Sequence, residues 1–236
     1  MKIGIMQPYF FPYLGYFSLI KHSDLFILLD EVQFIRHGWV ERNRILKQKD
    51  GWLYIKAPII KSSNKSKIKD CFINNQQEWE KKILAQLLTY KKIAPFYDVI
   101  IKLINQIFDK KHLTITELNK TALDKICQYL IIDTPINIFS KMELTIDEPE
   151  EPDDWALNIC KALGNVMEYW NLPGGHALFD LDKYFKAGID LKFQKVNLKP
   201  YDQNRVLFEP GLSIIDVMMF NTPEEINEML SNYDFI

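Results

Sequence analysis

Residues 2–30 read KIGIMQPYFFPYLGYFSLIKHSDLFILLD, and this stretch decides the fold. The apolar run at 2–6 is typical of a buried strand, and the segment 13–23 has the apolar spacing of a helix. A second apolar run at 25–30 ends in an acid. A strand, a helix and a second strand in this order predict a β-α-β unit, which pairs its strands in parallel through a right-handed crossover.

The rest of the chain repeats this alternation around a helical block at 77–131, where apolar residues recur at helical spacing. Further strands are expected at 52–59, 67–73, 136–139, 166–170 and 190–196, and further helices at 153–164, 180–187, 212–221 and 222–232. We therefore predict an α/β fold whose strands share one mainly parallel sheet of β-α-β units. Residues 1–75 and 132–236 are expected to form the core domain, and 76–131 a helical insertion that caps the sheet.

Composition limits the class of protein. The chain has 236 residues, of which 47% are apolar and 25% charged, as in ordinary globular proteins. A formal net charge of −2 argues against a nucleic-acid partner, because nucleic-acid-binding domains usually carry a basic surface. No apolar window is long enough for a membrane span, so no membrane insertion is expected. Three scattered cysteines in apolar surroundings, Cys71, Cys127 and Cys160, indicate free thiols and a cytoplasmic protein.

The turn at 7–15 contains two prolines, a glycine and four aromatic rings directly after the first strand. In an open parallel sheet, ligands bind outside the carboxyl ends of the strands. The prolines stiffen the turn, and Gly15 allows another group to approach closely. We predict an aromatic-walled mouth of a binding site here, with Gln7 as its polar contact and with Tyr13 and Tyr16 against the ligand. The alternative is that the rings cover the sheet edge as part of the core.

A second concentration of polar and aromatic residues follows the second strand, in LLDEVQFIRHGWVERNRI at 28–45. Asp30 ends that strand at the same edge of the sheet. A guanidinium group binds carboxylate or phosphate through two hydrogen bonds, and tryptophan offers a stacking face. The segment therefore predicts a loop that binds an anionic ligand with a ring, and the alternative is a solvated basic loop. The candidate binding residues are Gln33, Trp39, Arg42, Asn43 and Arg44.

Two weaker candidates lie in the second half of the chain. The paired glycines Gly174 and Gly175 follow an expected strand, where backbone N–H groups can hold a phosphate, although such a pair is often only a turn. Tyr201 and Gln203 precede a helix whose apolar run contains Asp216. A buried carboxylate needs partners that offset its desolvation, so pairing with an arginine and a role in chemistry both stay open.

These motifs resemble the WbqC-like family of bacterial proteins, which are often found with genes for O-antigen and other surface polysaccharides. The family pattern falls on Gln7, Pro8, Pro12, Gly15, Tyr16, Asp30, Gln33, Phe34, Trp39, Arg42, Asn43 and Arg44. Similar segments near 169–194 and 212–230 extend the resemblance over essentially the whole chain. The sequence departs from the pattern at His37, where a second basic residue is usual after Arg36, and at Glu41, where an amide is common.

The resemblance implies a transferase that acts on a nucleotide-activated amino sugar, by acyl or aminoacyl transfer to an amine, in surface-polysaccharide biosynthesis. In this interpretation Arg42 and Arg44 hold phosphate, Trp39 and the tyrosines stack on base or sugar, and Asp30 or His37 handles the proton of the amine. The partner is then a small molecule, a nucleotide sugar. The sequence names no cofactor, shows no metal-ligand cluster and leaves the oligomeric state open.

Two alternatives remain at this point. The turn at 7–15 also resembles, more distantly, the phosphate-binding turn of nucleotidylyltransferases, with Tyr13 and Tyr16 in place of their histidines. An enzyme of that kind would use ATP and magnesium, with Asp30 as a metal ligand. The second alternative is a non-catalytic protein of a glycan pathway that binds a nucleotide sugar.

Overall fold

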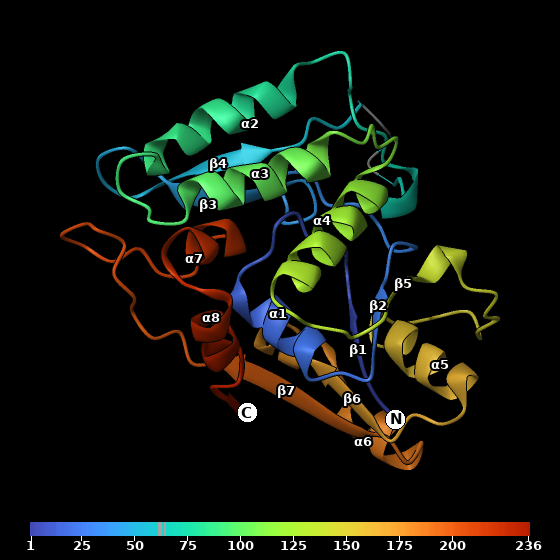
Figure 1. Ribbon diagram of the computed structural model, residues 1–236. Coiled ribbons are helices and arrows are strands. Elements are labelled where there is room, and N and C mark those ends of the chain that lie inside the picture. Colours follow the sequence, from blue (N-terminus) through green and yellow to red (C-terminus); the bar gives the residue numbers. More distant parts are fainter. Residues whose placement is uncertain (61–62, 64) are drawn as a thin grey trace.

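The structure is a computed structural model that describes residues 1–60, 63 and 65–236 (Figure 1). Residues 61, 62 and 64, in the polar link between the strands expected at 52–59 and 67–73, lie outside this description. None of the helices in the described part of the chain is both long and apolar enough to cross a membrane.

A six-stranded sheet in the order β5-β2-β1-β6-β7-β8 forms the centre of the molecule (Figure 1). Its strands are β1 (Lys2–Met6), β2 (Leu25–Leu28), β5 (Ile136–Ile138), β6 (Glu168–Asn171), β7 (Asp190–Val196) and β8 (Tyr233–Phe235). All neighbours are parallel except β7 and β8. The predicted α/β fold with a mainly parallel sheet is therefore confirmed, and the short edge strand β8 is an addition to it.

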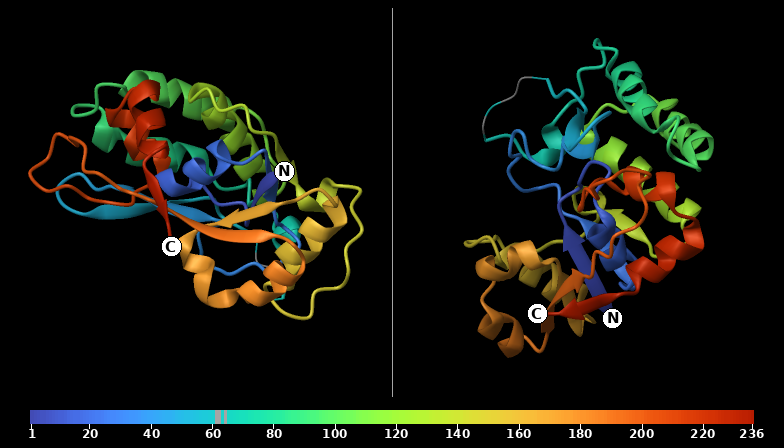
Figure 2. Two further views of the ribbon diagram at one scale, coloured as in Figure 1. Left: turned by 90° about the horizontal axis from the view of Figure 1, so that it is seen from below. Right: turned by 90° about the vertical axis from the view of Figure 1, so that its left-hand side faces the viewer.

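Helices cover both faces of this sheet, as the left view of Figure 2 shows. Along β2 the side chains alternate, so that Phe26 packs with Phe17 of α1 on one face while Ile27 packs with Ile159 of α5 on the other. The first face carries α1 (Leu14–Lys21), α4 (Ile115–Tyr129), α7 (Ile214–Phe220) and α8 (Pro223–Leu230), and the second carries α5 (Asp154–Leu163) and α6 (Leu181–Lys186).

The prediction that all strands share one sheet is wrong. A hairpin of β3 (Arg42–Leu46) and β4 (Trp52–Lys56) forms a separate antiparallel sheet. These two strands pair with each other across a short loop at 47–51. The loop is closed by a hydrogen bond from Lys47 N to Gly51 O, and Gly51 has a φ of 71°. Residues 67–73, expected as a strand, instead contain the short 3-10 helix η1 (Ile68–Asp70).

The block predicted as helical contains α2 (Trp79–Leu87), η2 (Leu88–Tyr90), α3 (Tyr97–Phe108) and α4. Thr114 and Glu117 form a capping box that starts α4. Side chains of this block, of the hairpin and of α1, α7 and α8 belong to one hydrophobic cluster. The remaining 3-10 helices are η3 (Phe139–Lys141) and η4 (Pro173–Leu178). The division of the chain into a core domain and a helical insertion stays a prediction.

Candidate functional site

A cavity at the carboxyl ends of β1, β2 and β6 has a volume of about 450 Å³, and we call it the sheet-edge cavity. The turn after β1, the end of β6, the start of α5 and η4 surround it. Its lining residues include Ile5, Met6, Gln7, Tyr9, Tyr13, Leu29, Trp39, Pro152, Trp155, Ala156, Tyr169, Asn171, Leu172, Gly174 and Gly175. The cavity lies where ligands of parallel α/β sheets bind.

A second cavity of about 280 Å³ adjoins the first, and we call it the arginine cavity. It is lined by Tyr9, Pro12, Tyr13, Trp39, Asn43, Arg44, Leu198 and Gly211. Tyr9, Tyr13 and Trp39 line both cavities and therefore form a shared aromatic wall. Burial raises the pKa of Tyr13 to about 12, with a smaller contribution from Tyr9, so its phenol stays protonated near neutral pH and can donate a hydrogen bond.

Asn43 holds the aromatic turn in place from the hairpin. Its Nδ2 donates to the backbone oxygens of Phe10 at 3.1 Å and Phe11 at 2.8 Å, and its Oδ1 accepts from the backbone N–H of Arg44 at 2.8 Å. Ser213 Oγ also donates to Phe11 O at 2.7 Å. These bonds hold Phe11 in the left-handed region at a φ of 42°, which a side chain such as phenylalanine rarely adopts.

Two further donors complete the support of the turn. Asn119 of α4 donates through Nδ2 to the backbone oxygens of Pro8 at 2.7 Å and Val40 at 2.9 Å. The Tyr16 hydroxyl donates to Gln7 O at 2.8 Å. Tyr16 itself is fully buried and lines neither cavity, so the structure places it beneath the site and not against a ligand.

Replacement of Asn43 by alanine is expected to lower the free energy of unfolding by about 2–4 kcal/mol, because three hydrogen bonds to buried backbone groups disappear. Urea titration of the two proteins measures this difference. Asn158→Ala is the control, since it removes one exposed hydrogen bond, to Asp147 O, and should cost less than about 1 kcal/mol. Equal losses in the two variants would show that Asn43 does not hold the turn.

Arg44 is the charged residue of the arginine cavity. Its guanidinium lies 5.6 Å from the ring centre of Trp39 and 5.2 Å from that of Trp52, and its Nη2 donates to Gly211 O at 3.0 Å. Its Nε is buried and makes no hydrogen bond within the described part of the chain. The group is therefore held in place while its buried Nε–H stays unused in the described chain.

Several predicted site residues lie outside both cavities, namely Tyr16, Asp30, Gln33, His37, Arg42, Tyr201 and Gln203. Asp30 is buried and accepts hydrogen bonds from Ser140 N at 3.0 Å and Ser140 Oγ at 2.6 Å, so it ties the end of β2 to η3. Burial raises the pKa of Asp30, and these hydrogen bonds oppose the shift. Its position favours a structural role over the predicted proton transfer.

In the segment between β2 and β3, the predicted site residues Gln33 and His37 line neither cavity. His37 has a φ of 60°, its backbone N–H donates to the Glu41 carboxylate, and its side chain is exposed. The exposed Gln33 forms a backbone bridge with Lys67. Arg42 is on strand β3, not in a loop as predicted, and its guanidinium lies 4.0 Å from the ring centre of Tyr54. Of the predicted arginines, Arg44 alone lines a cavity in the described residues.

Comparison with known proteins defines the family. The match to the WbqC-like protein family covers residues 7–228, which include most of the fold, all lining residues of the arginine cavity and those of the sheet-edge cavity except Ile5 and Met6. The chain belongs to the WbqC-like protein family. An uncharacterized protein of Mycobacterium tuberculosis, Rv1507c, is 29% identical over 232 residues, which cover 97% of each chain. No solved structure matches the sequence.

In this WbqC-like protein, Tyr201 and Gln203 contact Asp216 and line neither the sheet-edge cavity nor the arginine cavity. The Asp216 carboxylate is buried and accepts hydrogen bonds from Tyr90 Oη at 2.7 Å, Tyr201 Oη at 2.5 Å and Gln203 Nε2 at 2.8 Å. The hydrogen-bond partners in these contacts are neutral donors, and the charge of Arg205 also acts on the Asp216 carboxylate, so the two alternatives of pairing and chemistry narrow to a carboxylate held mainly by neutral groups. We call these four residues the Asp216 network.

The sequence interpretation of this WbqC-like chain missed three kinds of lining residue. Asn171 ends β6 just as Gln7 follows β1, so a polar residue at the end of a buried strand was a usable signal. Tyr9 belongs to the predicted aromatic mouth but was not named among the binding residues. Trp155 and Leu198 approach the cavities from distant parts of the chain, and no local pattern marks them.

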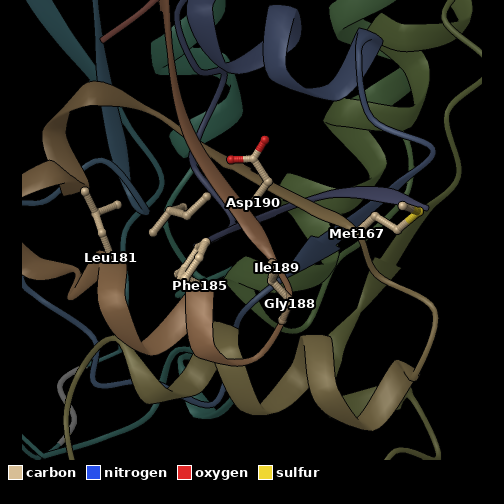
Figure 3. Close-up of a pocket in the computed structure, with 7 residues that line it drawn as sticks. Met167, Leu181, Phe185, Gly188, Ile189 and Asp190 are labelled. Atoms are coloured by element: carbon tan, nitrogen blue, oxygen red, sulfur yellow. The ribbon is translucent and has the colours of Figure 1, made fainter.

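A third hollow, of about 590 Å³, lies at the opposite edge of the sheet, where β6 and β7 begin (Figure 3). It is lined by Met167, Leu181, Phe185, Gly188, Ile189, Asp190 and Leu191. Its one charged group, the Asp190 carboxylate, pairs with Lys192 at 2.9 Å and points away from Phe185 in Figure 3. The hollow therefore offers apolar surface without a free polar group, and the candidate site is the pair of cavities at the carboxyl edge.

Proposed function

We propose that this WbqC-like protein binds a nucleotide-activated amino sugar in the sheet-edge cavity and transfers an acyl or aminoacyl group to the amine of the sugar. The observation that carries the proposal is the aromatic wall of Tyr9, Tyr13 and Trp39, which two adjoining cavities share. A flat ring of the ligand stacks on such a wall at little cost in conformational entropy. Two cavities on one wall suit a reaction between two groups held side by side.

Polar groups of the sheet-edge cavity support a sugar and its phosphates. Gln7 follows β1 and supplies an amide group that can orient hydroxyls, whereas Asn171, which ends the neighbouring strand β6, has its amide bonded to Tyr169 Oη and Leu172 N. Gly174 has open space around its α-carbon, and a side chain added there would meet nothing within 4 Å. In the proposal the backbone at Gly174 and Gly175 therefore takes the phosphate groups, because a glycine turn lets them come close.

The transfer itself joins the amine nitrogen of the sugar to the acyl carbon of a donor, and the bond from that carbon to its leaving group breaks. The amine proton leaves to water or to a base. Asp30 and His37 line neither cavity, so the proposal assigns the proton to neither residue. Catalysis would then come mainly from holding the two reactants in register.

Trp39→Ala is expected to weaken binding of uridine- or guanosine-diphosphate amino sugars by about tenfold or more, because a stacked base contributes roughly 1–3 kcal/mol. Trp52→Ala is the matched control. The two side chains are 42% and 38% exposed, but Trp52 lines neither cavity, so its loss should change the affinity by less than about threefold. Calorimetry of the three proteins gives the dissociation constants.

Two outcomes would contradict the proposal. Absence of binding for every nucleotide sugar would remove the ligand class, and equal effects of the two tryptophan changes would move the ligand away from the shared wall. Mass spectrometry of reactions with acyl donors then tests transfer, and parallel reactions with ATP and magnesium test nucleotidyl transfer. Binding without any product would leave a non-catalytic nucleotide-sugar-binding protein.

A further inference from the structure

We infer that the arginine cavity is a separate subsite for a small organic anion with an apolar body, filled while the sheet-edge cavity holds its own ligand. The inference rests on the proposed function only for the identity of the ligand in the sheet-edge cavity. The anion would be the second reactant or a part of it, and the chemistry that recognises it is a carboxylate or a phosphate group.

Charge is the first argument. Arg44 is half-buried and lines the cavity, and none of the residues lining it is acidic. No ion pair among the described residues includes Arg44. Its buried Nε–H has no acceptor in the described chain. A partly desolvated cation without an ion-pair partner is stabilised by an anion, which supplies the opposite charge.

The shape of the cavity is the second argument. Apart from Arg44 and Asn43 the lining is apolar or aromatic, with Pro12 and Leu198 facing the shared wall residues. Asn43 has its side-chain amide committed to the aromatic turn. The volume of about 280 Å³ lies at the lower end of the range for small-molecule sites, so the occupant is smaller than a nucleotide sugar.

Rigidity is the third argument. The Arg44 guanidinium lies near the rings of Trp39 and Trp52 and is bonded to Gly211 O. An arginine held in this way loses little freedom when an anion binds, so the position of its free Nε–H is defined beforehand. The same guanidinium connects the hairpin to the segment before α7. Gly211 of that segment lines one side of the cavity.

The test uses phenyl phosphate and phenylacetate as probes and phenylacetamide as the neutral probe of similar shape. The ¹H–¹⁵N signal of the Arg44 Nε–H, identified by its loss in Arg44→Lys, reports contact with the anion. We expect a saturable shift of this signal with one or both anions and none with the amide. The anion that binds more tightly tells whether phosphate or carboxylate is the preferred group.

Arg42→Lys is the matched control for Arg44→Lys, because Arg42 lies two residues earlier on β3, stacks on Tyr54 and lines neither cavity. Calorimetry should show anion binding weakened by about tenfold in Arg44→Lys, since a point charge cannot replace the guanidinium fork, and unchanged within about twofold in Arg42→Lys. Binding that survives Arg44→Lys, equal losses in both variants, equal binding of the amide, or no binding of any probe would each overturn the subsite.

A titration of nucleotide sugar into protein saturated with the better anion separates this inference from the proposed function. Nucleotide-sugar affinity within about threefold of that without anion is expected for two subsites. Competition would show that the arginine cavity belongs to the nucleotide-sugar site and would overturn the inference. If no nucleotide sugar binds, the proposed function fails, while a specific anion signal at Arg44 retains the subsite.

Discussion

Gly15→Ala is expected to weaken nucleotide-sugar binding by tenfold or more and to leave the fold intact. A β-carbon at this position would lie 2.5 Å from the ring and hydroxyl of Tyr13. The Tyr13 ring must therefore leave its place in the wall that both cavities share. The fold should hold because Gly15 lies in helix α1, where alanine is favoured over glycine by about 1 kcal/mol. Calorimetry and thermal melting of the purified variant measure the two effects.

Gly174→Ala is the control for the melting temperature alone, because the proposed function places phosphate groups against the backbone of this glycine. Its added methyl group meets nothing within 4 Å, so the melting temperature should not change and Tyr13 stays in place. In a Tyr13→Ala background, Gly15→Ala should cause no further loss of affinity, because the clash has been removed. Full affinity of the single Gly15→Ala variant would show that Tyr13 does not contact the ligand.

Asp216→Asn is expected to change how stability depends on pH. Burial raises the pKa of Asp216 from 3.8 to about 6 in the folded protein, against the effect of its three hydrogen-bond donors. Between these values the folded state binds more protons than the unfolded state, so the contribution of Asp216 to stability is complete below pH 4 and is lost as the pH rises through 6. The loss amounts to roughly 3 kcal/mol, at 1.36 kcal/mol per pKa unit.

Urea titrations of wild type and Asp216→Asn between about pH 4 and 7 measure this contribution as the difference between their free energies of unfolding. The wild type should lose stability relative to the variant as the pH rises. Asp133→Asn, at an exposed position, should follow the wild-type curve. A wild type that gains stability relative to Asp216→Asn over this range would show that Asp216 is ionised throughout and is stabilised by Tyr90, Tyr201 and Gln203.

Local patterns predicted the parallel part of the fold well. The apolar runs of β1 and β2 are buried on both faces, so each stands out in the sequence as a short continuous segment, whereas β7 alternates apolar and polar residues. Strand β3 was hidden because Arg42 and Arg44 occupy alternate positions, and its pairing with β4 is set by the hairpin and not by apolar periodicity. At 67–73 Ile68, Cys71 and Ile73 are buried in a segment of 3-10 helix and isolated bridges, and a strand pattern does not distinguish this arrangement.

The candidate site could be predicted for residues that come directly after a parallel strand. Gln7 and the glycine pair follow parallel strands, and the carboxyl ends of such strands lie at one edge. Asp30 and Tyr201 are also polar, but their side chains are bonded within the protein. Asp30 accepts a hydrogen bond from Ser140, and Tyr201 donates one to Asp216. Such partners decide whether a polar residue faces a cavity or supports the wall behind it. Residue spacing along the chain does not predict partners that are distant in sequence.

The donors that hold the aromatic turn come from three widely separated segments, with Asn43 on the hairpin, Asn119 on α4 and Ser213 just before α7. Translation makes Ser213 long after Asn43 and Asn119. A nascent chain can pair β1 with β2 early, but the carbonyl of Phe11 lacks one of its two side-chain donors until Ser213 has been made. Chains cut short before Ser213 therefore carry an incompletely supported turn.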